Sequence, residues 1–313
     1  MARAFTFPGQ GSQAVGMGRD LAQAFAAARE VFEEVDEALK HKLSKLMFEG
    51  PESDLTLTAN AQPALMTVSI AALRVLEREA KVDLPKVASY VAGHSLGEYS
   101  ALAAAGAISL SDAARLLRKR GEAMQKAVPV GEGAMAALLG LDADKAAEVA
   151  REAAQGDVCD FANDNAPGQV VVSGAKAAVE RALEIAKAKG GKRAILLPVS
   201  APFHCALMKP AADVMQDALA AVTIAPPRVP LVANVTAQAV SDPETIRKLL
   251  VQQVTGLVRW RECVLFLKQK GLTTLVEIGS GKVLTGLVRR IDPDLTGVSI
   301  QGPADIEAFI KTL

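Results

Sequence analysis

Apolar runs with strand character alternate along the chain with longer stretches whose apolar residues recur at helical spacing. Strands are predicted at residues 3–7, 87–92, 229–234, 273–278 and 298–300. Helices are predicted at residues 21–39, 60–80, 96–105, 109–124, 207–222, 244–253, 261–270 and 305–311, and irregular connections at 43–57. Pro63 is expected in the first turn of its helix. Strands that alternate with helices favour a parallel sheet covered by helices.

The middle of the chain has a different order of elements. Residues 133–199 predict the order β-α-β-β-α-β, which is that of a ferredoxin-like unit. The predicted strands cover 134–141, 158–163, 169–173 and 193–199, and the predicted helices cover 144–154 and 175–189. We therefore expect a small subdomain at 131–199, inserted into a large α/β subdomain made of 1–130 and 200–313.

The pentapeptide Gly93-His-Ser-Leu-Gly97 joins a predicted strand to a predicted helix. Small residues on either side of Ser95 suit a sharp turn that would expose the serine hydroxyl beyond the end of the sheet. The N-terminus of the helix, with the Leu96 N–H, would then face developing negative charge. This context favours a nucleophilic Ser95 in a hydrolase-like parallel sheet, and a purely structural turn is the alternative.

A serine nucleophile needs a base, and the chain has only three histidines. His41 lies in a charged stretch, and His94 is the direct neighbour of Ser95 on a tight turn. His204 is therefore the predicted base, with a structural histidine as the alternative. Its neighbour Cys205 is interpreted as a bystander.

A third group should orient the base. The carboxylates between Ser95 and His204 in the chain include Asp157, Asp160 and Asp164, which all fall in the predicted inserted subdomain. Their position there does not favour any of them as the orienting group.

The loop at residues 8–13 follows the first predicted strand. Gly9, Gly11 and Ala14 match a dinucleotide-binding fingerprint, but helical periodicity replaces the second strand and acidic residue that should follow. The favoured alternative is that this loop approaches the turn at Ser95, so that the backbone N–H groups of Gln10 and Leu96 form an oxyanion hole. Residues 279–282 resemble half of a phosphate-binding loop but lack its remaining residues.

Composition limits the class of protein. Half of the 313 residues are hydrophobic, and 35 Lys and Arg balance 35 Asp and Glu, so neither disorder nor global affinity for nucleic acid is indicated. The three cysteines are widely spaced and form no metal-binding pattern, which predicts reduced thiols. The first residues do not resemble a signal peptide, and no apolar run is long enough to span a membrane. We expect a soluble cytoplasmic protein.

Seven motifs in order resemble the malonyl-CoA:acyl carrier protein transacylases, the acyltransferases of type II fatty acid synthesis, over essentially the whole chain. They are Phe7-Pro-Gly-Gln-Gly-Ser-Gln13, Gly93-His-Ser-Leu-Gly-Glu98, Arg120-Gly-x-x-Met-Gln125, Asn165-Ala-Pro-Gly-Gln169, Ser200-Ala-Pro-Phe-His204, residues 253–260 and Glu277-Ile-Gly-Ser-Gly-Lys-Val-Leu284.

The resemblance implies roles for individual residues. Ser95 would be the nucleophile, His204 the base, and Gln10 and Leu96 the oxyanion-hole donors. The backbone carbonyl of Gln253 would orient the histidine in place of a carboxylate.

Substrate selection is also implied. Periodicity alone places Arg120 on a basic helix face, whereas the resemblance implies that it pairs with the malonyl carboxylate through its bidentate guanidinium. Leu257 departs from the proline usual in the family, and Phe203 is similar to malonyl-selective members.

The resemblance implies ping-pong transfer of a malonyl group from malonyl-CoA to the phosphopantetheine thiol of holo acyl carrier protein. No metal or redox cofactor, nucleic acid or membrane is expected, and we expect a monomer. The acidic carrier could dock on Lys187, Lys189, Lys192 and Arg193, or on Arg289 and Arg290. A serine esterase or thioesterase is the nearest alternative, and a non-catalytic carrier-protein-binding module is another.

Overall fold

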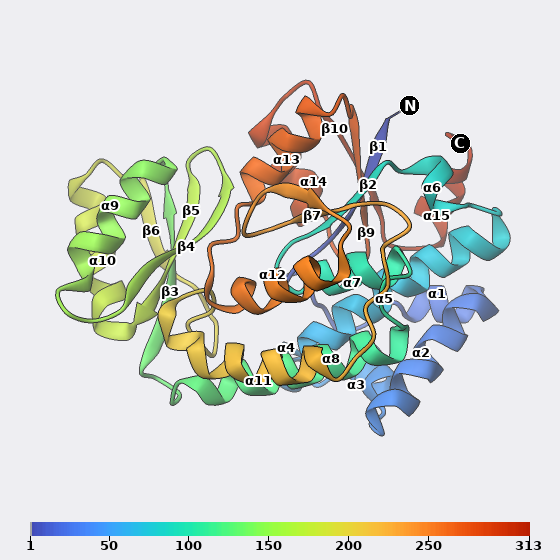
Figure 1. Ribbon diagram of the computed structural model, residues 1–313, viewed down its shortest axis with the longest axis horizontal. Coiled ribbons are helices and arrows are strands. Elements are labelled where there is room, and N and C mark those ends of the chain that lie inside the picture. The colour runs from blue at the N-terminus through green and yellow to red at the C-terminus, as the bar shows by residue number, and fades with distance from the viewer. Residues whose placement is uncertain (1) are drawn as a thin grey trace.

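The computed structural model describes residues 2–313 and contains two sheets (Figure 1). The larger sheet has six strands in the order β10-β9-β1-β2-β7-β8. Its strands are β1 (Arg3–Phe7), β2 (Tyr90–Gly93), β7 (Leu231–Ala233), β8 (Gln238–Val240), β9 (Thr274–Ile278) and β10 (Thr296–Ile300). The first five strands in this order pair in parallel, and β8 is antiparallel to β7 at the edge.

Helices cover both faces of this sheet (Figure 1). They are α1 (Arg19–Ala24), α2 (Ala26–Leu39), α3 (Leu43–Glu49), α4 (Glu52–Thr56), α5 (Thr58–Glu79), α6 (Leu84–Val87), α7 (Gly97–Ala104), α8 (Leu110–Ala127), α11 (Lys209–Ala220), α12 (Pro243–Thr255), α13 (Trp260–Gln269), α14 (Val283–Ile291) and α15 (Pro303–Ile310). A short 3-10 helix, Ala206–Met208, precedes α11.

Alternation of side chains along the strands divides the core between the two faces. Phe5 and Phe7 on β1 pack into the cluster that contains the apolar residues of α5 and α8. Ala4, which precedes Phe5 and points to the opposite face, packs with Trp260 of α13 and Leu284 of α14. Burial of both faces explains why these strands are continuous apolar runs, as is usual for parallel sheets.

The smaller sheet, at the left of Figure 1, is antiparallel with the order β4-β5-β3-β6. Its strands are β3 (Gly133–Leu139), β4 (Cys159–Ala166), β5 (Gln169–Ala175) and β6 (Arg193–Leu196), and its helices are α9 (Ala143–Ala154) and α10 (Lys176–Ala188). The α/β class, with a parallel large sheet and a ferredoxin-like βαββαβ unit, is confirmed. The boundaries 1–130, 131–199 and 200–313 stay a prediction.

The small sheet is tied to the large part of the chain beside the loop after α12. The Asp164 N–H donates to the Val258 carbonyl, and the Val258 N–H donates to the Ala162 carbonyl, both at 3.0 Å. The buried Asp164 carboxylate also accepts Nε and Nη2 hydrogen bonds from Arg261 of α13 at 2.7–3.0 Å. These contacts fix β4 against α13 and the connection that precedes it.

Several local expectations were wrong. Residues 43–57 form two short helices, α3 and α4, that bury Leu43, Met47 and Leu55. The helix predicted at 21–39 is broken at Phe25, whose backbone is extended. Pro63 lies beyond the first turn of α5, and both β8 and α14 were missed. Short elements carry too few periodic positions to stand out in a sequence.

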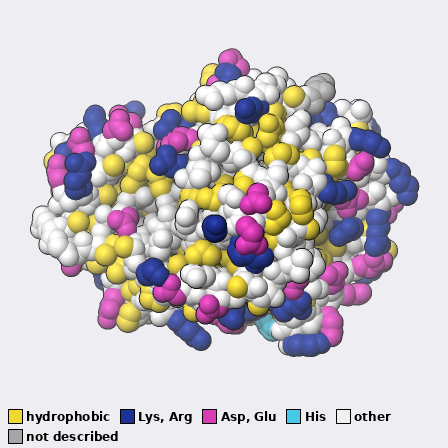
Figure 2. Space-filling model, in the orientation of Figure 1, with side chains coloured by type: hydrophobic (Ala, Val, Ile, Leu, Met, Phe, Trp, Pro, Cys, Tyr) yellow, Lys and Arg dark blue, Asp and Glu magenta, His cyan; other side chains and the backbone are white. Residues whose placement is uncertain are grey.

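No helix of residues 2–313 combines the length and the apolar character needed to cross a membrane. Lys, Arg, Asp and Glu side chains mix on the face shown in Figure 2.

Candidate active site

Ser95 occupies a strained turn between β2 and α7. Its φ is 53°, in the left-handed region that residues other than glycine rarely adopt. A Cβ at Gly93 would lie 1.9 Å from the carbonyl of Gly97, and a Cβ at Gly97 would lie 2.3 Å from the Phe7 carbonyl oxygen. The sharp turn predicted from the pentapeptide is therefore present, and it needs both glycines.

The structure brings Ser95, His204 and Gln253 together. The Ser95 Oγ and His204 Nε2 atoms are 2.7 Å apart, and His204 Nδ1 is 2.9 Å from the backbone carbonyl oxygen of Gln253. A carbonyl only accepts, so Nδ1 carries the proton and Nε2 is free to accept from the serine hydroxyl. This is the geometry of a nucleophile, a base and a group that orients the base.

The carboxylates between Ser95 and His204 in the chain have other partners. Asp157 pairs with Arg181, and Asp160 accepts a hydrogen bond from the Ala206 N–H. Asp164 pairs with Arg261.

The environment of His204 keeps its ring neutral. Burial, followed by the nearby positive charge of Arg120, lowers the pKa of His204 to about 3. The imidazole is thus unprotonated at neutral pH and can accept a proton from Ser95.

The loop after β1 lies against the Ser95 turn, as predicted. A Cβ at Gly9 would be 2.8 Å from the His94 carbonyl oxygen. Gln10 and Leu96 line the same cleft as Ser95, and across residues 2–313 neither backbone N–H donates to another protein group. The chain continues from this loop into α1 and α2, so the second strand of a dinucleotide-binding unit does not follow it.

Arg120 projects from α8 and is 1 % exposed. Its Nη1 donates to Gln62 Oε1 at 2.7 Å, and its Nη2 donates to Gln253 Oε1 at 2.8 Å and to Ser95 Oγ at 3.2 Å. A Cβ at Gly121 would lie 2.5 Å from the Cα of Ala59, which shows how closely α8 approaches α5. This close approach places the guanidinium beside the serine.

Two polar residues under the turn were missed by the sequence analysis. Asn234, which follows β7, accepts from the Ser95 N–H at 2.8 Å and donates to the Gly93 carbonyl at 2.7 Å. Glu98 is 1 % exposed, and burial raises its pKa to about 8 although hydrogen bonds from Asn234 and Gln253 oppose this rise. A charged residue in the first turn of an Ala- and Leu-rich helix was the available signal.

These residues surround a cleft of about 520 Å³ that both sheets help to form. Ser95, Arg120 and His204 come from the large part of the chain. Met135 of β3 and Asn165 of β4 come from the small one, and Asn165 Oδ1 lies 2.8 Å from His94 Nε2. The cleft is open to a ligand, and its side chains combine a serine, a histidine within hydrogen-bond distance of it and a buried cation.

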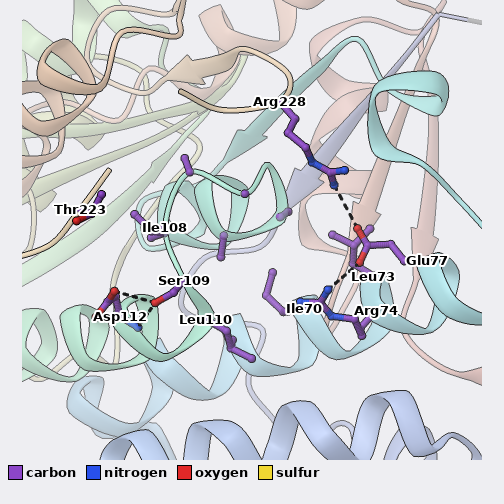
Figure 3. Close-up of a pocket in the computed structure, with 14 residues that line it drawn as sticks. Ile70, Leu73, Arg74, Glu77, Ile108, Ser109, Leu110, Asp112, Thr223 and Arg228 are labelled. Atoms are coloured by element: carbon purple, nitrogen blue, oxygen red, sulfur yellow. Dashed lines mark hydrogen bonds and ion pairs between the residues drawn. The ribbon is translucent and has the colours of Figure 1, made fainter. Parts of the chain in front are cut away.

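A second hollow, of about 710 Å³, lies away from Ser95 between α5, α7 and the end of α11 (Figure 3). Its charged side chains already have partners. Glu77 receives hydrogen bonds from Arg74 and Arg228, and Asp112 interacts with Ser109 at the start of α8. Ser109 is the N-cap of α8 and accepts from the Asp112 N–H, so its hydroxyl has a structural role there.

Within the described residues, no group of three or more His, Cys, Asp or Glu side chains is arranged to hold a metal ion. The absence of a metal or redox cofactor stays a prediction.

The model of the acyl transferase domain matches residues 4–291. The malonyl CoA-acyl carrier protein transacylase of Bacillus subtilis is 49% identical over 99% of this chain and 96% of its own length, and that of Escherichia coli K12 is 47% identical over 98% of both.

Solved structures agree with the sequence relatives. The acyl-carrier-protein-S-malonyltransferase of Bartonella henselae superposes with a TM-score of 0.97 at 58% identity, covering 100% of this chain and 99% of that one. A malonyl-transacylase in complex with a type II PKS acyl-carrier protein gives a TM-score of 0.96 at 44% identity and covers all of both chains. The chain is thus an acyltransferase that belongs to the malonyl-CoA:acyl carrier protein transacylase family.

Proposed function

We propose that the protein transfers a malonyl group from malonyl-CoA to the phosphopantetheine thiol of acyl carrier protein in fatty acid biosynthesis, through an ester on Ser95. One observation carries the proposal: Ser95 Oγ lies 2.7 Å from His204 Nε2 and 3.2 Å from Arg120 Nη2. A nucleophile, a base and a cation thus meet at one point. The names of the relatives supply the acyl group and its acceptor.

In the first half-reaction, His204 Nε2 takes the proton of Ser95 as Oγ attacks the thioester carbonyl of malonyl-CoA. The negative charge on the carbonyl oxygen faces the N–H groups of Gln10 and Leu96. The C–S bond then breaks, and His204 returns the proton to the departing CoA thiolate. The Gln253 carbonyl stabilises the imidazolium through the Nδ1 proton.

In the second half-reaction, the phosphopantetheine thiol replaces CoA. His204 takes the thiol proton as the sulfur attacks the malonyl ester, and Ser95 leaves with that proton. The product is malonyl thioester on the carrier protein, and the site is regenerated. Every step uses the same serine and histidine, as a ping-pong exchange requires.

Arg120 would select the acyl group. The guanidinium offers two parallel N–H donors to a carboxylate, and its Nε is buried without a hydrogen-bond acceptor in the described part of the chain. The malonyl carboxylate would supply the missing acceptor and the missing counter-charge. An acetyl group has no carboxylate that could accept these hydrogen bonds.

The acceptor is proposed to be holo acyl carrier protein, since a relative of 44% identity has been solved in complex with one. Arg289 and Arg290, in the last turn of α14, are the stronger candidates for docking it. Lys187 and Lys189 already pair with Glu184, Glu148 and Glu152, which neutralise their charge. A monomer located in the cytoplasm remains our expectation.

The test is the intact mass of the protein after brief exposure to malonyl-CoA, with Ser95→Ala as the matched control. We expect one malonyl adduct on the native protein and none on the variant, and holo acyl carrier protein should discharge it. Steady release of free malonate without transfer would indicate a hydrolase. Neither adduct nor turnover would contradict malonyl transfer and favour a module that only binds the carrier.

A further inference from the structure

Glu98 carries a buried carboxyl group next to the reacting groups, and the mechanism above does not use it. It lies in the first turn of α7, three residues after Ser95, and is 1 % exposed. Its Oε1 accepts from the Asn234 backbone N–H, and its Oε2 accepts from Gln253 Nε2, both at 2.5 Å. Hydrogen bonds to both oxygens hold the carboxylate in one orientation.

The side chain of Gln253 connects this carboxylate to Arg120. Gln253 Nε2 donates to Glu98 and, at 2.9 Å, to the Ser95 carbonyl, while its Oε1 accepts from Arg120 Nη2 at 2.8 Å. Arginine has only donors and this carboxylate accepts at both oxygens, so the amide can satisfy both neighbours in only one orientation. A directed chain runs from Arg120 through Gln253 to Glu98.

Burial makes this chain of hydrogen bonds important for Arg120. Within residues 2–313, Arg120 has no carboxylate at ion-pair distance, although it is 1 % exposed. A buried cation is stabilised when the polar groups around it are aligned toward it. Glu98 carries little negative charge at neutral pH, because burial raises its pKa to about 8. It therefore acts through the Gln253 amide, which donates to Glu98 and accepts from Arg120.

We propose that Glu98 is a positioning residue that fixes the Arg120 guanidinium through the Gln253 side-chain amide, and thereby sets the preference for an acyl group that bears a carboxylate. The proposal rests on the malonyl transfer proposed above. Glu98 does not itself contact the acyl group. It determines the orientation of the Arg120 guanidinium relative to the acyl carboxylate.

The test compares Glu98→Gln with the native protein for transfer from malonyl-CoA and from acetyl-CoA. Glutamine keeps the size of the side chain but replaces one accepting oxygen by an NH₂ group. That group faces either the Asn234 N–H or Gln253 Nε2, so one donor there loses its acceptor. We expect the malonyl-to-acetyl ratio of kcat/KM to fall by about tenfold or more, which corresponds to roughly 1.4 kcal/mol. The malonyl loss should appear mainly in KM, because the Ser95–His204 pair is unchanged.

Glu277→Gln is the matched control. Glu277 is equally buried, at 1 % exposure, and accepts from the backbone N–H groups of Leu284 and Thr285, outside the cleft. Its amide variant should lose stability without changing the malonyl-to-acetyl ratio. A general effect of replacing a buried carboxylate would move both variants alike.

A second variant keeps the test decisive if Glu98→Gln does not fold. Glu98→Asp keeps the carboxyl group but withdraws it by about 1.5 Å, one C–C bond, so it no longer reaches Gln253. The malonyl-to-acetyl ratio should again fall. A folded variant of either kind that keeps the native ratio within twofold overturns the proposal. If the native protein transfers no malonyl group, the proposed function has failed instead.

Discussion

Replacement of Arg120 by alanine is the strongest test of how the acyl group is selected. Among residues 2–313, Arg120 is the only Arg or Lys that lines the cleft with Ser95, and the change leaves both partners of the Ser95–His204 hydrogen bond in place. Arg118→Ala is the matched control, because Arg118 lies on the same helix and instead contacts Asn60 and His41. We expect a large loss for malonyl-CoA and a small one for acetyl-CoA.

The size of each loss follows from the contacts. Removal of one partner of a buried charge pair costs about 3–5 kcal/mol, so malonyl kcat/KM should fall by about 10² to 10³·⁵. Acetyl transfer loses only the 3.2 Å contact between Arg120 Nη2 and Ser95 Oγ, for which about 1 kcal/mol, a factor of roughly five, is expected. The malonyl-to-acetyl ratio should therefore fall at least about tenfold.

The assay measures kcat/KM for both thioesters with holo acyl carrier protein, and each preparation is normalised by titration of reactive Ser95. The melting temperature of Arg120→Ala serves to exclude unfolding. Equal losses for the two acyl groups, or a loss of similar size in Arg118→Ala, would refute a contact between Arg120 and the acyl carboxylate.

Two further results are expected. The pKa of His204 is lowered to about 3 in the folded protein, below its ordinary value of 6.5. The stabilisation from its neutral form is therefore complete above pH 6.5 and is lost as pH falls from 6.5 toward 3. His204→Gln should flatten that part of the curve of unfolding free energy against pH. Gly93→Ala should prevent folding or lower the unfolding free energy by more than about 3 kcal/mol, since its Cβ would lie 1.9 Å from backbone atoms. Gly286→Ala is the control. Its Cβ would have open space around it, so thermal unfolding should show a neutral change or a stabilisation of up to about 1 kcal/mol.

The local geometry of the turn at Ser95 could be predicted because five adjacent residues encode it. Gly93 and Gly97 are needed at these positions for contacts within the turn and with β1, so the pattern itself carries the information. His204 could be proposed as the base for a different reason, since a chain with three histidines leaves few choices. The two residues selected in this way lie together in the structure, with Ser95 Oγ 2.7 Å from His204 Nε2.

The group that orients His204 could not be predicted from side-chain types. Gln253 holds His204 through a backbone carbonyl, and every residue has one, so residue type gives no signal. Only the resemblance to a family pointed to it. Arg120 was likewise one of several arginines on an amphipathic helix until the close packing of α8 on α5 set it beside Ser95.

The sequence by itself determined the alternation of strands and helices, the βαββαβ order of the inserted segment and the strained turn at Ser95. Each depends on residues near one another in the chain, where periodicity and glycine positions act directly. Tertiary structure alone decided that Glu98, Gln253 and Arg120 form one hydrogen-bonded chain. These residues come from three helices, and no pattern along the chain records which buried donors and acceptors will meet when those helices pack.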